Sequence, residues 1–356
     1  MLSLKNIFSI SYAIVLITSV TLCHATLASQ SFNQPYGVLV DREENVYIAD
    51  TQNNQVKKID LSGHLSTIAG TGVRGFAGDN GKATNAMLKS PSNLSIDSHG
   101  NLYIADFGSH RIRKIDTSGN ISTVAGNGSQ AFSGDGGPAI AASLSKPFGV
   151  FVDDKDNLYI ADMGNNRIRK VDATSQLIST VAGNGVAAQY TGDGGPAIMA
   201  SLWNPTGILV DKAHNLLIAD FGNNCVRKVD ATSNVISTVA GNGFSGFGGD
   251  GGPAIDAALH YPAGISIDQS GNLYIADTYD NRIRRVDALT GKISTVAGTG
   301  SFGFNGDDIL ASIAMLNAPF GIAFDKMDNL YIADTDNSRI RKVSLSTKII
   351  TTLVAN

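Results

Sequence analysis

Short apolar segments recur along most of the chain, and turn-forming residues bound each of them. In one stretch the segments are residues 93–97, 101–106, 111–116 and 121–126, with Ser, Gly, Thr and Asn common in the gaps. Short segments rich in β-branched and aromatic side chains are typical of strands joined by hairpins. The pattern therefore predicts a meander of four antiparallel strands.

The same pattern repeats six times. The tetrapeptide Tyr-Ile-Ala-Asp occurs five times, and a sixth time as Leu-Ile-Ala-Asp, at intervals of 56 to 58 residues. The six aspartates are Asp50, Asp106, Asp162, Asp220, Asp277 and Asp334. Units of this size without spacers pack against one another around a shared core. We predict an all-β fold over residues 29–356: a six-bladed β-propeller of four-stranded antiparallel blades. A β-solenoid is the alternative, but its turns are nearer about 20 residues.

A glycine-rich stretch stands between the fourth strand of one unit and the first strand of the next. In one copy it spans Gly134–Leu144, and the other four copies begin at Gly78, Gly192, Gly249 and Gly306. Glycine permits a tight turn, and Pro138 favours the start of a helical turn. Ile140 and Leu144 lie four residues apart, which is the spacing of one helical face. The sequence thus predicts short helical insertions between the blades.

Strand direction predicts where these inserts lie. Successive strands of a blade alternate in direction outward from the channel. The turns between second and third strands and the five inserts must therefore open on one side of the ring, which we call the insert face. Long loops on a rigid scaffold are common binding sites. The first unit begins near residue 32 and the last ends at residue 356, so we expect each blade to contain its own four strands.

Three segments of the third unit resemble an NHL repeat. They are Pro147-Phe148-Gly149-Val150, Asn157-Leu158-Tyr159-Ile160-Ala161-Asp162 and Asn166-Arg167-Ile168-Arg169-Lys170-Val171-Asp172. All six units match, over about residues 32 to 355. The resemblance implies a six-bladed propeller that binds other macromolecules. The family also includes or borders on enzymes such as peptidyl-hydroxyglycine lyases. The units here are longer than the usual NHL repeat, and the glycine-rich stretch holds the excess.

The N-terminal residues 1–28 have the organisation of a secretory signal peptide. Lys5 precedes an apolar run over 7–22, and the small residues Ala25 and Ala28 follow. This run is shorter than the roughly 20 residues that span a bilayer, so we expect no membrane span after cleavage. Cys23 matches a lipoprotein box poorly because Leu22 precedes it. An uncleaved anchor and lipidation of Cys23 are the alternatives, and the expected location is secreted or periplasmic.

Charge and cysteine content narrow the possible partners. The full chain carries −4, and loss of Lys5 leaves 26 basic against 31 acidic residues, or −5. Adjacent cations such as Arg113-Lys114 recur on the third strands, but the acidic balance argues against nucleic acid. We therefore interpret these pairs as a solvated outer-strand face. Without Cys23, Cys225 is the single thiol, so the domain relies on packing and not on an internal disulfide.

In four of the six units an arginine stands five residues after the aspartate of the tetrapeptide. A hairpin of that length brings the two side chains together, which predicts a charge-assisted turn staple in each blade. Gln55 and Cys225 replace the arginine in two units. The four predicted pairs are Asp106/Arg111, Asp162/Arg167, Asp277/Arg282 and Asp334/Arg339.

Candidate metal and catalytic residues are sparse. Each of the five inserts has an aspartate after its first glycine, which raises the possibility of calcium, but Ca²⁺ takes six to eight oxygen ligands. Turn formation explains these aspartates more simply: Asp79, Asp135, Asp193, Asp250 and Asp307. No two histidines occupy equivalent channel positions, so we assign no catalytic residue and no metal ligand, and the assignment as an enzyme leans negative.

The remaining candidates are aromatic or break the repeat. Trp203, Tyr190 and Phe221 fall on the predicted insert face of blades three and four, and Trp203 is the single tryptophan. Asn93 stands where the other five first strands have glycine. We predict a binding scaffold for a protein or glycan partner. The alternative is a channel-centred, divalent-metal-dependent lyase or lactone hydrolase.

Overall fold

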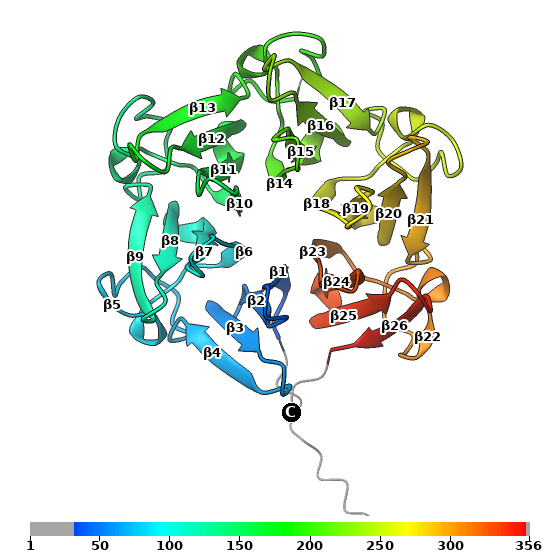
Figure 1. Cartoon of the computed structure of the whole chain (residues 1–356), viewed down its shortest axis with the longest axis horizontal. Helices are drawn as coiled ribbons and strands as arrows, with labels where there is room; N and C mark the ends of the chain where they lie inside the picture. The colour runs from blue at the N-terminus through cyan, green and yellow to red at the C-terminus, as the bar shows by residue number, and fades with distance from the viewer. Residues whose placement is uncertain (1–31, 189, 354–356) are drawn as a thin grey trace, which may run out of the picture. The chain divides into compact units, whose positions relative to one another are not determined.

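The structure is a computed structural model that describes residues 32–188 and 190–353. These residues form a ring of six antiparallel sheets around a central axis (Figure 1). The predicted six-bladed propeller is confirmed. The predicted signal peptide, residues 1–28, and Cys23 lie outside the described residues.

Each blade consists of four consecutive strands ordered from the axis outward. The first strands are β1 (Pro35–Val40), β6 (Pro91–Ile96), β10 (Pro147–Val152), β14 (Pro205–Val210), β18 (Pro262–Ile267) and β23 (Pro319–Phe324). The second strands are β2 (Val46–Asp50), β7 (Leu102–Asp106), β11 (Leu158–Asp162), β15 (Leu216–Asp220), β19 (Leu273–Asp277) and β24 (Asn329–Asp334). The third strands are β3 (Gln55–Ile59), β8 (Arg111–Ile115), β12 (Arg167–Val171), β16 (Cys225–Val229), β20 (Arg282–Val286) and β25 (Arg339–Ser344). The outer strands are β4 (Leu65–Ala69), β9 (Asn120–Ala125), β13 (Ile178–Ala182), β17 (Ile236–Ala240), β21 (Ile293–Ala297) and β26 (Ile349–Thr352).

The apolar core is divided among the junctions between blades. At the junction of blades one and two, Ala49 and Val56 of the first blade pack with Ile104 and Ile121 of the second, and Leu88 of the insert completes the cluster. Equivalent clusters occupy the other junctions. A single blade therefore buries its apolar faces only when it has neighbours, as expected for a repeat architecture.

The ring closes by packing of whole blades. Strands β1 to β4 form one sheet, and β23 to β26 form another, so no strand crosses the join. Across this join Thr335 Oγ1 donates to the carbonyl of Pro35 at 2.7 Å. Phe32 is buried in the same cluster, with Leu353 packed against it. The expectation that each blade contains its own four strands is confirmed.

Each insert leaves the outer strand of one blade, runs beside the outer end of the next blade, and leads to the first strand of that blade. Its helical turn is a single 3₁₀ turn, and two inserts also add a short fifth strand to the following blade: β5 (Gly81–Lys82) and β22 (Ile309–Leu310). The five turns are η1 (Ala83–Asn85), η3 (Ala139–Ala141), η5 (Ala197–Met199), η7 (Ala254–Asp256) and η9 (Ala311–Ile313).

The insert helices are shorter than the sequence pattern suggested. Leu144 is fully buried as expected, but Ile140 is 60% exposed, so the two do not share a buried face. The reason is that the backbone returns to an extended conformation at Ala142, which ends the helix after three residues. The buried positions are instead Ala139, Ala142 and Leu144.

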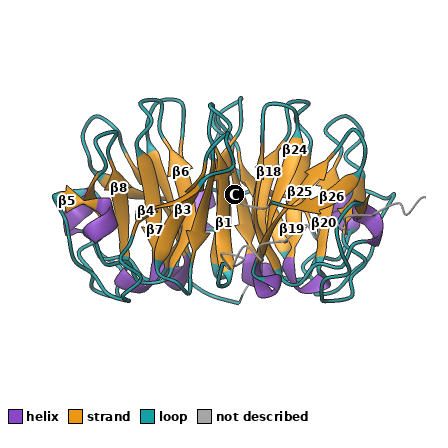
Figure 2. Ribbon diagram, turned by 90° about the horizontal axis from the view of Figure 1, so that it is seen from below, coloured by secondary structure: helices purple, strands orange, loops and turns teal. Residues whose placement is uncertain are grey.

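The inserts and the turns between second and third strands lie on the same side of the ring, as predicted. Figure 2 shows the 3₁₀ turns of both kinds toward one face, and plain hairpin turns at the other. Asn165 Nδ2 in a strand turn donates to the carbonyl of Ala131 in an insert at 2.8 Å. The strand turns are η2 (Phe107–Ser109), η4 (Met163–Asn165), η6 (Phe221–Asn223), η8 (Thr278–Asp280) and η10 (Thr335–Asn337). None of the helices among the described residues has the length and hydropathy needed to span a membrane.

Glycine near the axis allows neighbouring first strands to approach closely. A Cβ at Gly149 would stand well inside contact distance of the Thr206 carbonyl oxygen in the next blade. We expect Gly149→Ala to lower the free energy of unfolding by about 1–3 kcal/mol, the range typical of overpacking. Gly248→Ala is the control, because nothing lies within 4 Å of its Cβ position. Urea denaturation of both variants checks this, and equal stabilities would contradict the proposed packing constraint.

Candidate functional site

A fully buried arginine lies on the third strand of every blade that an insert precedes. In blade three, Arg169 Nη2 is 2.6 Å from Asp135 Oδ1 of the insert, and Nη1 is 3.3 Å from Asp162 Oδ2 at the end of β11. A buried guanidinium needs this degree of compensation because desolvation of an ion is costly. The five arginines are Arg113, Arg169, Arg227, Arg284 and Arg341, and each has the same two kinds of carboxylate nearby.

The predicted partners of the tetrapeptide aspartates are wrong by two residues. Asp106 does lie opposite Arg111 in the strand ladder, but the Arg111 guanidinium donates to the carbonyls of Ser109 and Asn127. The Asp106 carboxylate instead lies 3.7 Å from Arg113. Arg113 lies two residues further along the same strand and on the same side of it as Arg111. Its side chain extends back toward the end of β7, where Asp106 lies. The correction applies to Asp106/Arg111, Asp162/Arg167, Asp277/Arg282 and Asp334/Arg339.

The interpretation of the adjacent cations as a solvated face is also wrong for one member of each pair. Arg113 is completely buried, whereas Lys114 is partly exposed and lies over the Tyr103 ring. Blade one differs, because Lys57 occupies the arginine position and no insert precedes that blade. Lys57 Nζ donates to Thr67 Oγ1 at 2.7 Å. The joint occurrence of insert aspartate and third-strand arginine is the sequence signal that identifies the correct pair.

Four of the five insert aspartates, Asp79, Asp135, Asp193 and Asp250, have protein partners on both carboxylate oxygens. Asp135 Oδ1 accepts from Arg169, and its Oδ2 accepts from Thr180 Oγ1 at 2.7 Å. Asp79 makes the equivalent contacts with Arg113 and Thr123. Calcium at these loops would have to compete with a guanidinium, and it stays an untested prediction.

Aromatic side chains two residues before the inserts cover these arginines. Phe132 lies over Arg167 and Arg169, with ring-to-guanidinium distances of 3.8 and 4.8 Å. Tyr190 occupies the same position over Arg227 at 5.4 Å, and its hydroxyl lies 2.8 Å from Thr238 Oγ1. The structure therefore gives Tyr190 a packing role at the outer edge of the ring, away from the other candidates. Its role in binding stays a prediction.

An aromatic cluster occupies the axial end of the insert face. The rings of Tyr36, Phe148 and Phe320 come from blades one, three and six, and their centroids lie 4.7 to 5.9 Å apart. Since blades three and six are opposite in the ring, these side chains meet across the axis. Phe107 contacts Phe148, and Phe221 contacts Phe320. All five rings are partly exposed.

The cluster continues over blades four and five. Phe221 stacks on Tyr261 with centroids 4.8 Å apart, and Tyr279 meets both rings edge-on. His260 stacks on Tyr261, and its Nδ1 lies 3.5 Å from Asp280 Oδ1. We call Tyr36, Phe107, Phe148, Phe221, Tyr261, Tyr279 and Phe320 the axial aromatic cluster. Of the predicted binding residues, Phe221 belongs to it.

A hydroxyl group of one blade donates a hydrogen bond to a first-strand carbonyl of the next blade, and its position decides where an aromatic side chain can stand. Thr278, the residue after Asp277, donates to the first-strand proline carbonyl of the next blade. In blades two and four this position is Phe107 or Phe221, and the hydroxyl comes from Ser92 or Thr206 on the first strand. The two positions thus exchange roles in these blades. Blade three has no hydroxyl at either position, which hold Phe148 and Met163.

Trp203 packs on the backbone of Gly222, in the turn of its own blade that also holds Phe221 of the axial aromatic cluster. Its indole covers Gly222 in η6, where a Cβ would overlap the ring. Its backbone N–H donates to Asp220 Oδ1 at 2.7 Å, and its carbonyl accepts from the Gly222 N–H. Trp203 and Phe221 therefore flank the same glycine, and the structure brings these two candidates together.

Asn93 lies in a different place, on the wall of an axial cavity of about 740 Å³. Its Oδ1 accepts from the Val150 N–H of blade three at 3.3 Å, and Ser95 Oγ accepts from the Val152 N–H at 3.0 Å. The asparagine thus satisfies a backbone group that faces the channel. Asn93 was predicted as a binding residue of the insert face, but it lines the axial cavity instead, and its role in binding stays a prediction.

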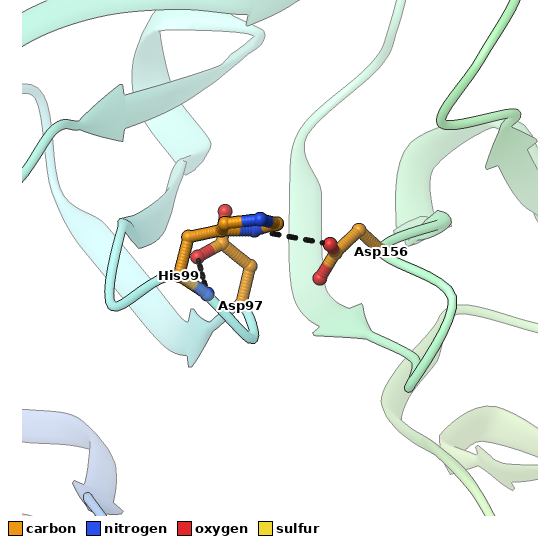
Figure 3. A group of neighbouring side chains, drawn as sticks. All are labelled: Asp97, His99 and Asp156. Atoms are coloured by element: carbon orange, nitrogen blue, oxygen red, sulfur yellow. Dashed lines mark hydrogen bonds and ion pairs between the residues drawn. The ribbon is translucent and has the colours of Figure 1, made fainter.

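One group of three potential metal ligands is found among residues 32–188 and 190–353: Asp97, His99 and Asp156. It lies on the hairpin-turn face between blades two and three, and His99 Nδ1 is 3.2 Å from Asp156 Oδ2 (Figure 3). Asp97 is already bonded to the backbone and side-chain amides of Asn101. The group does not line the axial cavity.

Burial changes the acidity of the tetrapeptide aspartates. Desolvation raises the pKa of Asp106, Asp162, Asp220 and Asp334 to about 6. It raises the pKa of Asp277 to about 7, and the nearby Asp280 carboxylate adds to the increase. Burial disfavours the ionised form of these carboxyls, and the nearby arginine offsets this only in part.

These observations define a six-bladed β-propeller with a closed axial aromatic cluster. The chain matches the model of the teneurin NHL domain over residues 74–133 and 243–305, and that of the NHL repeat over 316–343. The chain thus contains NHL repeats.

Two curated relatives are similar over most of the chain. Protein SUPPRESSOR OF QUENCHING 1, chloroplastic, from Arabidopsis thaliana is 29% identical over 291 residues, which cover 78% of this chain and 27% of that protein. Human NHL repeat-containing protein 2 is 28% identical over 348 residues, which cover 90% of this chain and 47% of that protein. The chain thus spans less than half the length of both relatives.

Solved structures share the fold at low sequence identity. A Bacteroides thetaiotaomicron protein of unknown function has a TM-score of 0.67 at 19% identity, covering 92% of this chain and 71% of that one. An auxiliary nutrient binding protein from the same species has a TM-score of 0.63 at 16% identity, covering 90% and 70%. A streptogramin B lyase has a TM-score of 0.56 at 15% identity, covering 90% and 86%. These similarities show the fold alone.

The raised pKa values predict a dependence of stability on pH. A carboxyl with a raised folded-state pKa stabilises the fold fully below its unfolded pKa of about 4, and this contribution is lost as pH rises through the folded value. For Asp277, with a folded-state pKa of about 7, we expect stability to fall by about 2 kcal/mol between pH 5 and pH 8. The Asp277→Asn variant should lack this part of the fall in stability when its free energy of unfolding is measured by urea denaturation at pH 5 and at pH 8.

The matched control is Asp287→Asn, because hydrogen bonds from Thr290 lower the pKa of this partly exposed carboxylate and it does not titrate in this window. This variant should keep the wild-type dependence on pH. If Asp277→Asn also keeps the wild-type dependence of stability on pH, the buried Asp277 carboxyl does not carry a proton at pH 5 in the folded state.

Proposed function

We propose that the propeller is a binding scaffold whose partner, a protein or a glycan, docks on the axial aromatic cluster of the insert face. The observation that carries this proposal is the continuous set of partly exposed rings at the centre of that face. Tyr279 is 52% exposed at its edge. Aromatic side chains supply large contact areas at low entropic cost, and Tyr and Trp are frequent in binding hot spots.

The backbone at Tyr261 supports a role in binding. The residue has φ of 53°, in the left-handed region that a bulky side chain seldom adopts. The equivalent positions in the other blades hold smaller or more flexible residues: Gln34, Ser90, Lys146, Asn204 and Ala318. Strain of this kind is common at functional sites. Here it presents the Tyr261 ring against Phe221 and Tyr279.

Polar groups surround the rings and can fix the orientation of a partner. Gln34 Nε2 donates to Asp336 Oδ1 at 3.1 Å, and burial together with the Asp336 charge raises the pKa of Tyr36, so its phenol stays protonated at neutral pH. His260 and Asp280 lie on the other side of the cluster. Stacking would provide the contact area and these hydrogen-bonding groups the specificity.

The proposed location is secreted or periplasmic, on the basis of the signal-like residues 1–28. The solved structure named as an auxiliary nutrient binding protein is consistent with a binding role. The fold likeness to a lyase does not favour enzyme chemistry here, because the Asp97, His99 and Asp156 group lies outside the axial cavity.

Site-specific photocrosslinking tests the docking surface. A benzophenone side chain at Tyr279 should capture a defined partner from the native source, whereas one at Leu289, 96% exposed in the hairpin between β20 and β21, should not. The identified partner should then bind Tyr261→Ala at least about tenfold more weakly, as expected for loss of a hot-spot aromatic. Ala318 occupies the same left-handed position in blade six, so this substitution is tolerated by the backbone.

Trp203→Ala distinguishes a direct contact from a supporting one. If Trp203 only covers Gly222, its loss should lower thermal stability more than affinity for the captured partner. Equal capture at Tyr279 and Leu289, or full affinity of Tyr261→Ala, would place the binding surface elsewhere.

A further inference from the structure

The axial cavity is a second site, separate from the proposed docking surface. It lies between the first strands of all six blades, and its lining extends to the turns at 211–213 and 268–271. It therefore opens on the face opposite the inserts, the side with plain hairpin turns in Figure 2. The aromatic cluster crosses the axis at the other end. Its volume, about 740 Å³, falls in the range of roughly 300–1,000 Å³ typical of small-molecule sites.

The wall of this cavity is mainly aliphatic. One position of each first strand supplies a branched aliphatic side chain: Val38, Leu94, Val150, Ile208, Ile265 and Ile322. The following position is also apolar in four blades, whereas blades two and five have Ser95 and Ser266 there. An occupant must therefore have a largely apolar body to gain from burial here.

The turns around the mouth of the cavity are acidic. Each turn between a first and a second strand begins with an aspartate: Asp41, Asp97, Asp153, Asp211, Asp268 and Asp325. With histidine neutral, these turns carry eleven acidic and four basic side chains, over 41–45, 97–101, 153–157, 211–215, 268–272 and 325–328. The whole chain has a net charge of only −4, so the negative charge is concentrated here. Third-strand lysines pair with two of the six, Asp97 and Asp325. The remaining charge favours a cationic ligand.

Asp211 differs from the other five turn aspartates in its hydrogen bonds. Each of those five has a second-strand tyrosine as a partner, as in blade one, where Tyr47 Oη lies 3.1 Å from Asp41 Oδ2. In blade four the same position holds Leu217, the one departure from Tyr-Ile-Ala-Asp among the six tetrapeptides. Among the described residues, Asp211 Oδ2 therefore accepts from the Asn215 amide and from no hydroxyl.

The free acceptor position of Asp211 is on the cavity side of the blade. Leu217 pairs across the sheet with Leu209, so the two side chains project from the same face. Leu209 lines the cavity, as Asp211 itself does, and Asp268 of the next blade lines it too. A hydrogen-bond donor that enters the cavity can therefore reach a half-buried carboxylate whose usual hydroxyl partner is missing.

We propose that this cavity binds a primary alkylamine of medium chain length in its protonated form, with the ammonium group at Asp211 and the aliphatic chain along the first strands. The ammonium donates to Asp211 in place of the tyrosine hydroxyl, and Asp268 adds to the negative potential. Lys212 is the one basic residue of the lining, and its side chain is exposed, so it weakens the attraction without closing the site. The site is on the opposite face from the proposed partner surface, so the two proposals stand or fall independently.

Isothermal titration calorimetry with decylammonium chloride, below its micelle concentration, tests the proposal on the purified protein. We expect one decylammonium to bind per chain, with decanol and decanoate binding at least about tenfold more weakly. Asp211→Asn should weaken decylammonium binding by at least about fivefold, because the charge is lost and one acceptor becomes a donor. Asp153→Asn is the matched control, because Asp153 holds the same turn position in blade three but does not line the cavity. It should bind decylammonium nearly as the wild type does.

Leu217→Tyr tests the free acceptor without a change of charge. The tyrosine supplies Asp211 with the hydroxyl that the other five blades have, so decylammonium binding should weaken by about two- to fivefold, within the range for one hydrogen bond. Lys212→Gln should bind decylammonium at least as tightly as the wild type, because it removes a like charge from the mouth. Unchanged binding by Leu217→Tyr, or weaker binding by Lys212→Gln, would contradict the placement of the ammonium at Asp211.

A substitution that fills the cavity distinguishes this site from adsorption of a cation on the acidic face. Ser266→Phe places in blade five the side chain that blade three already has at Phe151, and it should weaken decylammonium binding by at least about tenfold through loss of volume. If this variant folds poorly, Ala323→Leu, which copies Leu39 and Leu209, serves the same purpose. Absence of decylammonium binding to the wild type would overturn the proposal. So would unchanged binding by Asp211→Asn or by a folded, filled variant, or binding of decanoate as tight as that of decylammonium.

Discussion

A buried arginine held between two carboxylates is the interaction on which the rest of this propeller depends. In blades two to six, one carboxylate ends the second strand and the other belongs to the preceding insert. Removal of either partner would leave charge uncompensated in the interior, where it is most costly. The insert is therefore held against the blade because the buried arginine needs the insert carboxylate as a partner. That attachment positions the insert face.

The two faces of the ring then acquire different chemistry from the same repeat. On the insert face, exchange of hydroxyl and aromatic residues between two positions lets blades two and four contribute Phe107 and Phe221 while Ser92 and Thr206 keep the blades joined. On the opposite face, the first strands end in short turns around an apolar cavity with Asp211 at its mouth. A repetitive scaffold is thus made asymmetric by a few substitutions near the axis, where the blades converge.

Much of the architecture was predictable because it follows from local pattern and period. Strand positions, blade number, closure and the common face of inserts and turns are all carried by the 56- to 58-residue repeat. The partner of Asp162 was not predictable from the period, because Arg167 and Arg169 are on the same side of one strand. Only the contact with the insert aspartate decides which of the two is buried. The aromatic cluster joins Tyr36, Phe148 and Phe320 across the axis. Contacts between blades that are not neighbours leave no periodic signal in the chain.

A double-mutant cycle between Arg169 and Asp135 tests the central claim most directly. The free energy of unfolding would be measured for the wild type, Asp135→Asn, Arg169→Met and the double variant. If the guanidinium joins the insert to the blade, Asp135→Asn destabilises the wild type but has little further effect in Arg169→Met, with a coupling energy of about 1–3 kcal/mol. Additive effects, within about 0.5 kcal/mol, would show that the insert is held by other contacts and would contradict the account.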